Sequence, residues 1–269
     1  MPELPEVETI ANGLNKRVAG DVIESVWVGT KPEPMKSKPA AIVRALEGAR
    51  IDRVQRVGKH IVFHLTGKKK KPGDFIVHLG MTGRMLVADP DDEVAKHTHL
   101  TARLKSGREM RFVDPRRFGR LEVRDGRFTG PGVEPTTITP DAFAELFHRS
   151  KAPIKAALLN QKFLHGVGNI YADESLIRAG VRPRRRANTL TRMELNKLHA
   201  ALQAVLQEAI RAGGSSVSDY VDADGEEGFF QLQHRAYGRE GEPCLVCKTP
   251  IKKITVGGRG THYCPKCQK

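Results

Sequence analysis

The first 126 residues show one helical pattern followed by a series of short extended patterns. Apolar residues three or four apart, at Val7, Ile10, Leu14 and Val18, follow Pro5, a residue that suits a first helical turn. We therefore predict a helix over residues 5–17. After Gly20 the composition becomes β-like in seven runs, several of them alternating apolar and polar residues: 22–28, 49–57, 60–66, 74–80, 98–104, 109–114 and 119–125.

The second half of the chain is predicted to be helical. It follows FTGPGVEPTTITPD at 128–141, a segment rich in glycine, proline and threonine that is typical of a linker. Helix starts are predicted at Thr139, at Pro153 and at Thr191, which forms a capping box with Glu194. These patterns divide the chain into a sheet-rich domain at 1–130, a linker at 131–138, a helical domain at 139–228 and a C-terminal module at 229–269.

The net charge of the chain indicates which class of molecule it binds. The 269 residues carry 45 Lys and Arg against 31 Asp and Glu, a formal net charge of +14. Such an excess favours a polyanion, with nucleic acid ahead of an anionic membrane surface. No run of 18 or more apolar residues occurs, and acidic residues stand where a signal peptide would be basic and then apolar. We expect a soluble, intracellular protein.

The four cysteines form two CxxC pairs near the C-terminus, Cys244 with Cys247 and Cys264 with Cys267, separated by 16 residues. This spacing is typical of a four-cysteine zinc site, and four thiolates leave no position for a catalytic water. We predict one structural Zn²⁺; a redox CxxC is the alternative, although one pair would suffice for it. Between the pairs, two strand-like runs joined by GGRG predict a β-hairpin with Arg259 at its tip.

A glycine-rich turn precedes a predicted helix in LHGVGNIYADESLIRAGVRPRRR. Amide groups at a helix N-terminus favour an anion, and Gly166 and Gly168 would let a phosphate approach the backbone. Asn169 adds a side-chain donor, and the arginines at 182 and 184–186 extend the positive surface. An ordinary tight turn is the alternative, but with the net charge we favour a phosphate-backbone site.

Six motifs in order resemble a known family across essentially the whole chain: MPELPE at the start, HLGMTG at 78–83, DPRRFG at 114–119, GVGNIYADE at 166–174, YGREGEPC at 237–244 and the paired CxxC. The chain closely resembles bacterial formamidopyrimidine-DNA glycosylase. The resemblance implies an α+β fold with an N-terminal β-sandwich and flanking helices, a helix-two-turn-helix domain and a four-cysteine zinc finger. It also implies double-stranded DNA with oxidised purines as substrate, and strand cleavage by β,δ-elimination.

The resemblance gives the first residues a chemical role. A small residue at position 2 permits removal of Met1, which would expose a secondary amine with a pKa of about 8 that is partly neutral near neutral pH. Pro2 would attack the sugar C1′ to form a Schiff base, and Glu3 would act as acid and base on the opened sugar. Without the resemblance, Pro2 and Glu3 are more simply a helix lead-in. Lys59 matches the family's proton donor in β-elimination, and Arg259 matches the arginine assigned to δ-elimination.

Other residues match family positions that hold the DNA. An enzyme that extrudes a base must fill the vacated space, and Met81, Arg116 and Phe118 match that wedge; a buried Met and Phe beside an ion-paired Arg is the alternative. Five further side chains, together with Arg116, are expected to contact the DNA: His97, Arg117, Lys151, Lys155 and Asn169. The segment 213–228 resembles the loop that closes over the lesion base, with Ser215, Ser216, Val217, Ser218, Asp219 and Tyr220 at its start. Many relatives carry a basic residue where this chain has Ser218, and the lysine run at 68–71 has no assigned role.

Two other functions compete with this one. Endonuclease VIII of the same superfamily prefers oxidised pyrimidines, but Leu4 and the complete wedge favour the purine branch. A non-catalytic zinc-ribbon protein would explain the charge and the cysteines without requiring Pro2 or Glu3. We expect a DNA-repair glycosylase and lyase that acts as a monomer in the bacterial cytoplasm, at the nucleoid, without a membrane partner.

Overall fold

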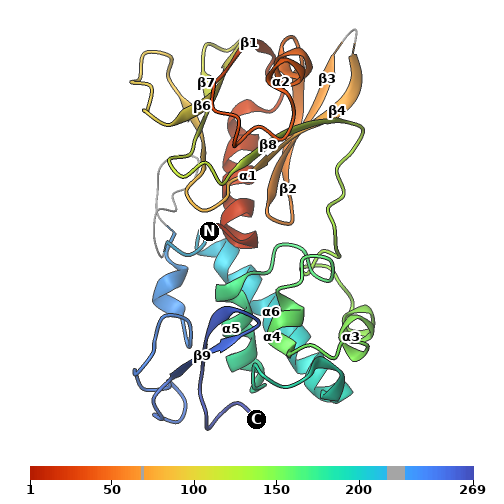
Figure 1. The fold of residues 1–269 in the computed structure, drawn as a ribbon, viewed down its shortest axis with the longest axis vertical. Coiled ribbons are helices and arrows are strands. Elements are labelled where there is room, and N and C mark those ends of the chain that lie inside the picture. The colour runs from red at the N-terminus through yellow and green to blue at the C-terminus, as the bar shows by residue number, and fades with distance from the viewer. Residues whose placement is uncertain (68–69, 217–227) are drawn as a thin grey trace. The chain divides into compact units, whose positions relative to one another are not determined.

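The computed structural model describes residues 1–67, 70–216 and 228–269, with the side chains of residues 70 and 71 left out. The chain forms two compact units (Figure 1). Residues 1–129 and 213–228 make up the first unit, and residues 130–212 and 229–269 make up the second. Within the described part of the chain, no helix has the length and apolar character needed to cross a membrane.

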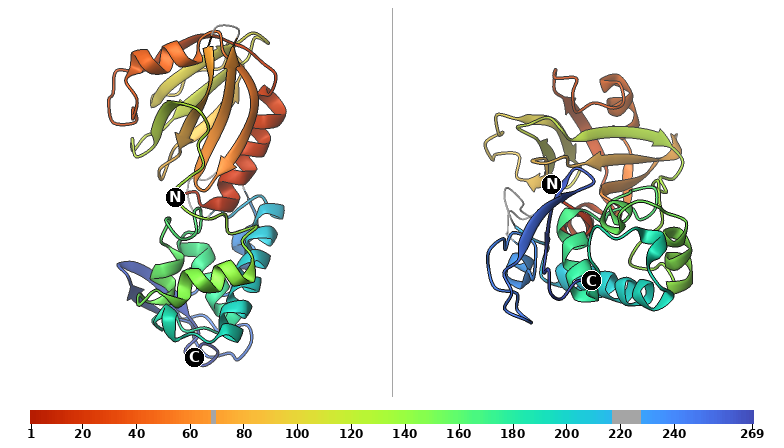
Figure 2. Two further views of the ribbon diagram at one scale, coloured as in Figure 1. Left: turned by 90° about the vertical axis from the view of Figure 1, so that its right-hand side faces the viewer. Right: turned by 60° about the horizontal axis from the view of Figure 1, so that its bottom comes forward.

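The first unit opens with helix α1, Leu4–Val18. Pro5 lies in its first turn, and its apolar residues fall on one face, where Leu4, Val7, Leu14 and Val18 are fully buried. The helix packs along strand β2, and Figure 2 shows it, in red, beside the β2–β3 pair. It begins within a residue of the predicted start.

Two antiparallel four-stranded sheets follow. One has the strand order β1-β6-β7-β5, and the other has the order β2-β3-β4-β8. The strand bounds are Ile23–Val28 (β1), Arg50–Val57 (β2), His60–Gly67 (β3), Lys70–His78 (β4), Arg84–Ala88 (β5), Thr98–Leu104 (β6), Glu109–Val113 (β7) and Arg120–Asp125 (β8). Short helix α2, Pro39–Leu46, contacts β1, β4 and β8.

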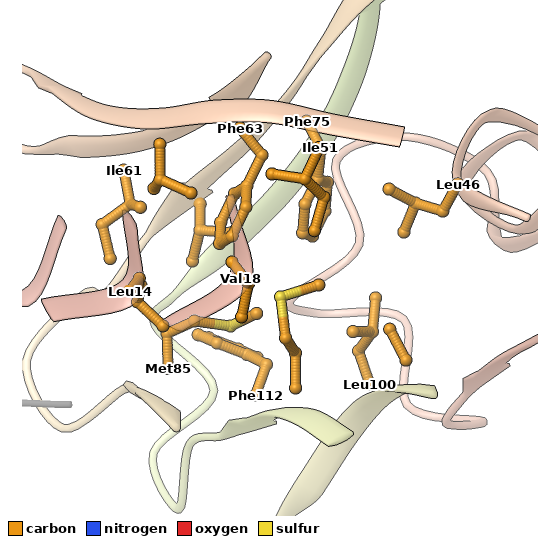
Figure 3. Close-up of a cluster of buried hydrophobic side chains, with 14 of the residues drawn as sticks. Leu14, Val18, Leu46, Ile51, Ile61, Phe63, Phe75, Met85, Leu100 and Phe112 are labelled. Carbon is orange, nitrogen blue, oxygen red and sulfur yellow. The ribbon is translucent and has the colours of Figure 1, made fainter. Parts of the chain in front are cut away.

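The inward faces of both sheets and of α1 meet in one core (Figure 3). Phe63 and Phe75 lie 5.5 Å apart between ring centroids on the β2-β3-β4-β8 side, and Met85 and Phe112 come from the other sheet. Each buried side chain of this size contributes about 1.5–3 kcal/mol through its removal from water. The predicted β-sandwich with flanking helices is confirmed.

Strand register brings three turns to one end of the β2-β3-β4-β8 sheet. His60 pairs with His78, and His78 pairs with Arg120, so these residues form a row across three strands. Lys59 is the residue before His60. Met81 follows His78 by three residues, and Phe118 precedes Arg120 by two residues. The chain reverses direction between antiparallel strands at this end of the sheet, so residues far apart in sequence lie at the same end.

The second unit is mainly helical, with a small hairpin. Its helices are α3 (Pro140–His148), α4 (Ile154–Leu158), α5 (Asn169–Ala179) and α6 (Arg192–Arg211), with short 3₁₀ turns η1 (Ala187–Thr189) and η2 (Phe230–Gln233). The predicted capping box starts α6: Glu194 Oε2 accepts the Thr191 N–H at 2.8 Å, and the Thr191 hydroxyl accepts the Glu194 N–H. Strands β9 (Lys252–Val256) and β10 (Arg259–Tyr263) form the predicted hairpin, in dark blue beside α5 in Figure 2.

Three features differ from the sequence-based expectations. Strand β5 and helix α2 were missed because each is short, with five and eight residues. The segment predicted as a linker packs onto the second unit: Val133 N–H donates to Phe163 O at 2.9 Å, and His165 N–H donates to Val133 O. Residues 213–228 belong to the first unit, although they continue the chain after α6.

Candidate active site and nucleic-acid interface

Pro2 and Glu3 are held at the start of α1. Met1 is exposed, Pro2 is buried and Glu3 is 4% exposed. The Glu3 backbone is extended, and its N–H donates to Glu6 Oε2 at 2.8 Å. Glu6 thus fixes the peptide that joins the two predicted catalytic residues.

Glu6 also fixes the beginning of the predicted lesion loop. Its other oxygen, Oε1, accepts the Ser215 N–H at 2.8 Å. Gly214, at φ +85°, lies so close that a Cβ there would be 2.9 Å from Glu6 Cγ. Glu6 was not singled out from the sequence, although its capping-box spacing from Glu3 was visible. Of the predicted loop, Ser215 is buried and Ser216 Oγ accepts the Gly228 N–H, whereas Val217, Ser218, Asp219 and Tyr220 lie outside the described residues.

Lys59 occupies the two-residue turn between β2 and β3. Gly58, at φ +62°, permits this turn, and Lys59 is 9% exposed. Arg56 anchors the turn, because its Nε donates to Glu8 of α1 at 2.5 Å and its Nη1 donates to Gly58 O. The Lys59 turn is therefore attached to the same helix that carries Glu3.

His78 adds a neutral imidazole beside Lys59. Burial lowers the pKa of His78 from 6.5 to about 4, and the nearby His60, Lys59 and Arg120 act in the same direction. Its Nδ1 accepts the Gly80 N–H at 3.1 Å, which orients the turn that leads to Met81. The His60 and His78 rings lie 5.1 Å apart between centroids.

The predicted wedge side chains are exposed, in contrast to the alternative of a buried Met and Phe. Met81 is 42% exposed and Phe118 is 50% exposed. The guanidinium of Arg116 lies over the Phe118 ring at 4.8 Å from its centroid. Of the two other expected contacts in this unit, His97 is exposed, and Arg117 is half-buried with an ion pair to Glu33 at 2.7 Å.

The expected contacts in the second unit differ in their availability. Lys151 and Arg259 are exposed, the latter at the start of β10. Asn169 begins α5, where its amide donates to Gly260 O at 3.0 Å. Lys155 is fully buried: its ammonium contacts Asp173 at 2.7 Å and donates to Gly260 O and Thr261 Oγ1, both at 2.9 Å. The ammonium of Lys155 therefore supports the hairpin in this structure.

Two adjacent acidic residues of α5 hold the C-terminal module. Asp173 Oδ2 accepts the His262 N–H of β10 at 2.9 Å. The Glu174 carboxylate accepts the backbone N–H groups of Arg235, Ala236 and Tyr237 at 2.9–3.0 Å. The sequence signal for this role was two adjacent acidic residues inside a predicted helix, among the apolar residues of IYADESLI.

The four cysteines come together as predicted. Their sulfur atoms all lie within 4.8 Å of one another, with Cys247 and Cys264 at 3.4 Å. Two of the thiols precede β9 in the chain and the other two follow β10. This set of four sulfur ligands suits a tetrahedral structural metal. The module would hold the backbone that presents Arg259.

The four basic residues after α5 are only partly available to a phosphate. Arg185 pairs with Glu194 at the start of α6, and Arg182 donates to Pro265 O at 3.0 Å. Arg184 and Arg186 are exposed. The helix N-terminus predicted from Gly168 is present, since Gly168 is the N-cap of α5.

Comparison with known proteins shows which family has these domains and site residues. Residues 1–121 match the formamidopyrimidine-DNA glycosylase N-terminal domain, residues 130–221 match the H2TH domain of the same enzymes, and residues 241–269 match the zinc finger found in FPG and IleRS. Fold, site and these matches define a zinc-finger DNA glycosylase that acts on damaged DNA. The chain belongs to the formamidopyrimidine-DNA glycosylase family.

Individual relatives agree over the full length. The formamidopyrimidine-DNA glycosylase of Solibacter usitatus is 43% identical and that of Listeria monocytogenes is 40% identical, each over 100% of both chains. The MutM (FPG) structure from Thermus thermophilus has a TM-score of 0.87 at 41% identity and covers 99% of this chain and 98% of its own. A Lactococcus lactis FPG mutant bound to DNA has a TM-score of 0.91 at 35% identity and covers 100% of both chains.

Proposed function

We propose that this chain is a bifunctional glycosylase and lyase that excises oxidised purines from duplex DNA and then cuts the strand at the abasic site. The observation that carries this proposal is the amino-terminal arrangement. A buried proline and a buried carboxylic acid are adjacent, held by Glu6, with Lys59 on a turn attached to the same helix. The carboxyl group of Glu3 stands at the N-terminus of α1, where the helix dipole stabilises negative charge.

The first step is nucleophilic. After loss of Met1, the neutral Pro2 nitrogen attacks C1′ of the damaged nucleotide and the N–C1′ bond forms; the base leaves with the electrons of the glycosidic bond and takes a proton from water. The Glu3 carboxylate removes the proton from the Pro2 nitrogen and passes it to the sugar ring oxygen as the bond from C1′ to that oxygen breaks, which leaves an iminium between Pro2 and C1′. A secondary amine suits this step because about a tenth of it is neutral near pH 7.

Elimination then breaks the strand. The Glu3 carboxylate takes a C2′ proton and the 3′ phosphate leaves; water then takes the C4′ proton and the 5′ phosphate leaves, after which water hydrolyses the bond between C1′ and the Pro2 nitrogen and releases the sugar fragment. We assign Lys59 to the first elimination and Arg259 to the second, as proton donor and phosphate contact respectively. Both are cations suited to an anionic leaving group.

Substrate recognition is assigned to both units. Met81, Arg116 and Phe118 would fill the space left by the extruded base, and the exposed apolar surface of Met81 and Phe118 suits that task. His97, Arg117, Lys151 and Asn169 are proposed phosphate contacts. Fapy-dG containing DNA and carbocyclic 8-oxo-G containing DNA are bound in the solved relatives, which supports oxidised purines as the substrate class.

The metal proposed for the cysteine module is one structural Zn²⁺, held by Cys244, Cys247, Cys264 and Cys267. When bound, zinc would cross-link the two ends of the hairpin and take no part in the reaction. We further propose that the protein acts as a monomer in the bacterial cytoplasm.

Borohydride trapping tests the reaction. Protein whose loss of Met1 is verified by intact mass should form a covalent adduct with duplex DNA containing 8-oxoguanine opposite cytosine. Glu3→Gln should abolish base release and keep DNA affinity, whereas the control Glu24→Gln, at an exposed position of β1, should behave like the unmodified protein. If the protein binds DNA but forms no covalent adduct, the enzyme proposal is wrong and the chain is a zinc-bearing DNA-binding protein.

A further inference from the structure

The wedge residues come from two loops that are distant in sequence. Met81 lies in a tight turn closed by the Gly83 N–H, which donates to Leu79 O at 2.9 Å. Arg116 and Phe118 lie in the loop between β7 and β8. An exposed wedge on two independent loops would be deflected easily when pushed into stacked bases, so something must join the loops.

The Asp114 carboxylate contacts both loops. Asp114 is fully buried, and its Oδ1 accepts the hydroxyl of Thr82 at 2.6 Å, the residue directly after Met81. Oδ2 accepts the Gly119 N–H at 2.7 Å, directly after Phe118, and Oδ1 also accepts the Arg116 N–H at 3.3 Å. A buried carboxylate with donors on both sides is a strong cross-link, because each hydrogen bond to a charged group is strengthened by the low local dielectric.

The two backbones also touch directly. Gly80, at φ +63°, lies so close to the second loop that a Cβ would stand 2.5 Å from the carbonyl carbon of Phe118. Only glycine permits this approach at this backbone angle. The Thr82–Asp114 hydrogen bond therefore lies beside a tight backbone contact and fixes the register between the loops.

The backbone of Asp114 also hydrogen-bonds to the segment that contains His97, another residue expected to contact the DNA. Its N–H donates to His97 O at 2.9 Å, and its carbonyl accepts from His99 Nε2 at 2.9 Å. One buried residue thus contacts the chain at the Met81 turn, at the Phe118 loop and at His97.

We infer that Asp114 and Thr82 are positioning residues that join the two loops into a single wedge, so that base extrusion depends on their hydrogen bond. This inference rests on the proposed function. It assigns neither residue to the bond-breaking steps.

Thr82→Val tests the inference because it removes the hydroxyl and keeps the shape, and Thr82 is only half-buried. Single-turnover rates should be measured on duplex DNA with 8-oxoguanine opposite cytosine and on the same duplex with an abasic site, where no base must be extruded. We expect excision to slow at least about tenfold and abasic-site cleavage to change less than about twofold. Thr82→Ser, which keeps the hydroxyl, should restore excision.

A control variant tests whether loss of any threonine hydroxyl in this unit slows excision. Thr66→Val removes a hydroxyl–carboxylate bond of similar length, 2.7 Å to Asp52, at an exposed position of the same unit and should leave both rates unchanged. In a double-mutant cycle, Thr82→Val should cost little once Met81→Ala has removed the wedge side chain.

The outcomes are distinguishable from failure of the proposed function. If the unmodified protein does not excise 8-oxoguanine, the proposed function is wrong. If it does, and Thr82→Val excises equally fast or slows both substrates equally, the positioning role is wrong. Should Thr82→Val fold poorly, Asp114→Asn provides the second test. It should show the same selective loss on the base-containing duplex, and an equal loss on both duplexes would overturn the inference.

Discussion

The ammonium of Lys155 lies 2.7 Å from a carboxylate oxygen of Asp173, and both side chains are fully buried. The pair lies between α4 and α5, and the same ammonium donates to two residues of β10. A lysine that looks like a phosphate contact in the sequence therefore holds the hairpin that carries Arg259.

Lys155→Met should destabilise the protein because it leaves the Asp173 charge buried without its partner, at a cost of about 3–5 kcal/mol. Urea denaturation measures this loss. Lys151→Met, at an exposed site, should instead reduce the slope of the salt dependence of DNA binding by about one without changing stability. A reduced slope with unchanged stability for Lys155→Met would restore Lys155 as a direct phosphate contact.

Glu6→Gln should slow base excision. Glu6 accepts two backbone N–H groups, from Glu3 and Ser215, and a glutamine has one acceptor oxygen, so one buried N–H loses its partner at a cost of about 1–3 kcal/mol. Single-turnover excision and thermal denaturation measure the two effects. Glu145→Gln, at an exposed surface pair, is the control and should change neither; an unchanged excision rate in Glu6→Gln would separate Glu6 from the active site.

Metal analysis of the purified protein should find one zinc per chain. Because the four cysteines of the module are all the cysteines of the chain, a thiol reagent should find none reactive in the native protein and all four after chelation and unfolding. Cys264→Ser should lose zinc and weaken DNA binding, since Arg259 would lose its support. Full DNA affinity without zinc would contradict the role assigned to the module.

Acid should destabilise the second unit through Glu194. Hydrogen bonds from Arg185, with help from Thr191, lower the pKa of Glu194 from 4.5 to about 2 in the folded protein. The unfolded chain binds a proton first as pH falls, so the stability from this group is present above about pH 4.5 and disappears toward pH 2. Glu194→Gln should lower the melting temperature at pH 6 and flatten its dependence on pH in that window, measured by circular dichroism. An unchanged slope would show that the Arg185 pair contributes nothing.

Local patterns allowed much of the fold to be predicted. The spacing of Val7, Ile10 and Leu14 indicated α1, and Thr191 with Glu194 marked the start of α6. The CxxC spacing predicted a four-sulfur cluster that the structure contains. Each of these features depends on residues within a few turns or one hairpin, so the sequence carries the information directly.

The roles of Lys155 and Glu6 could not be predicted in this way. Lys155 and Gly260 are 105 residues apart, and Glu6 and Ser215 are 209 residues apart. A lone Lys or Glu has the same local pattern whether it faces solvent or is buried against a distant partner. The resemblance of the motifs to a family indicated where chemistry is expected, but it did not indicate which charges the fold uses internally.

The sequence by itself determined most of the helices and strands, the cysteine cluster and the family, because short-range periodicity, capping and motif spacing are properties of neighbouring residues. The tertiary structure alone decided that Lys59, Met81 and Phe118 adjoin the same end of one sheet and that Asp114 joins two of their loops. The physical reason is strand register: pairing His60 with His78 and His78 with Arg120 depends on how the whole sandwich buries its apolar faces.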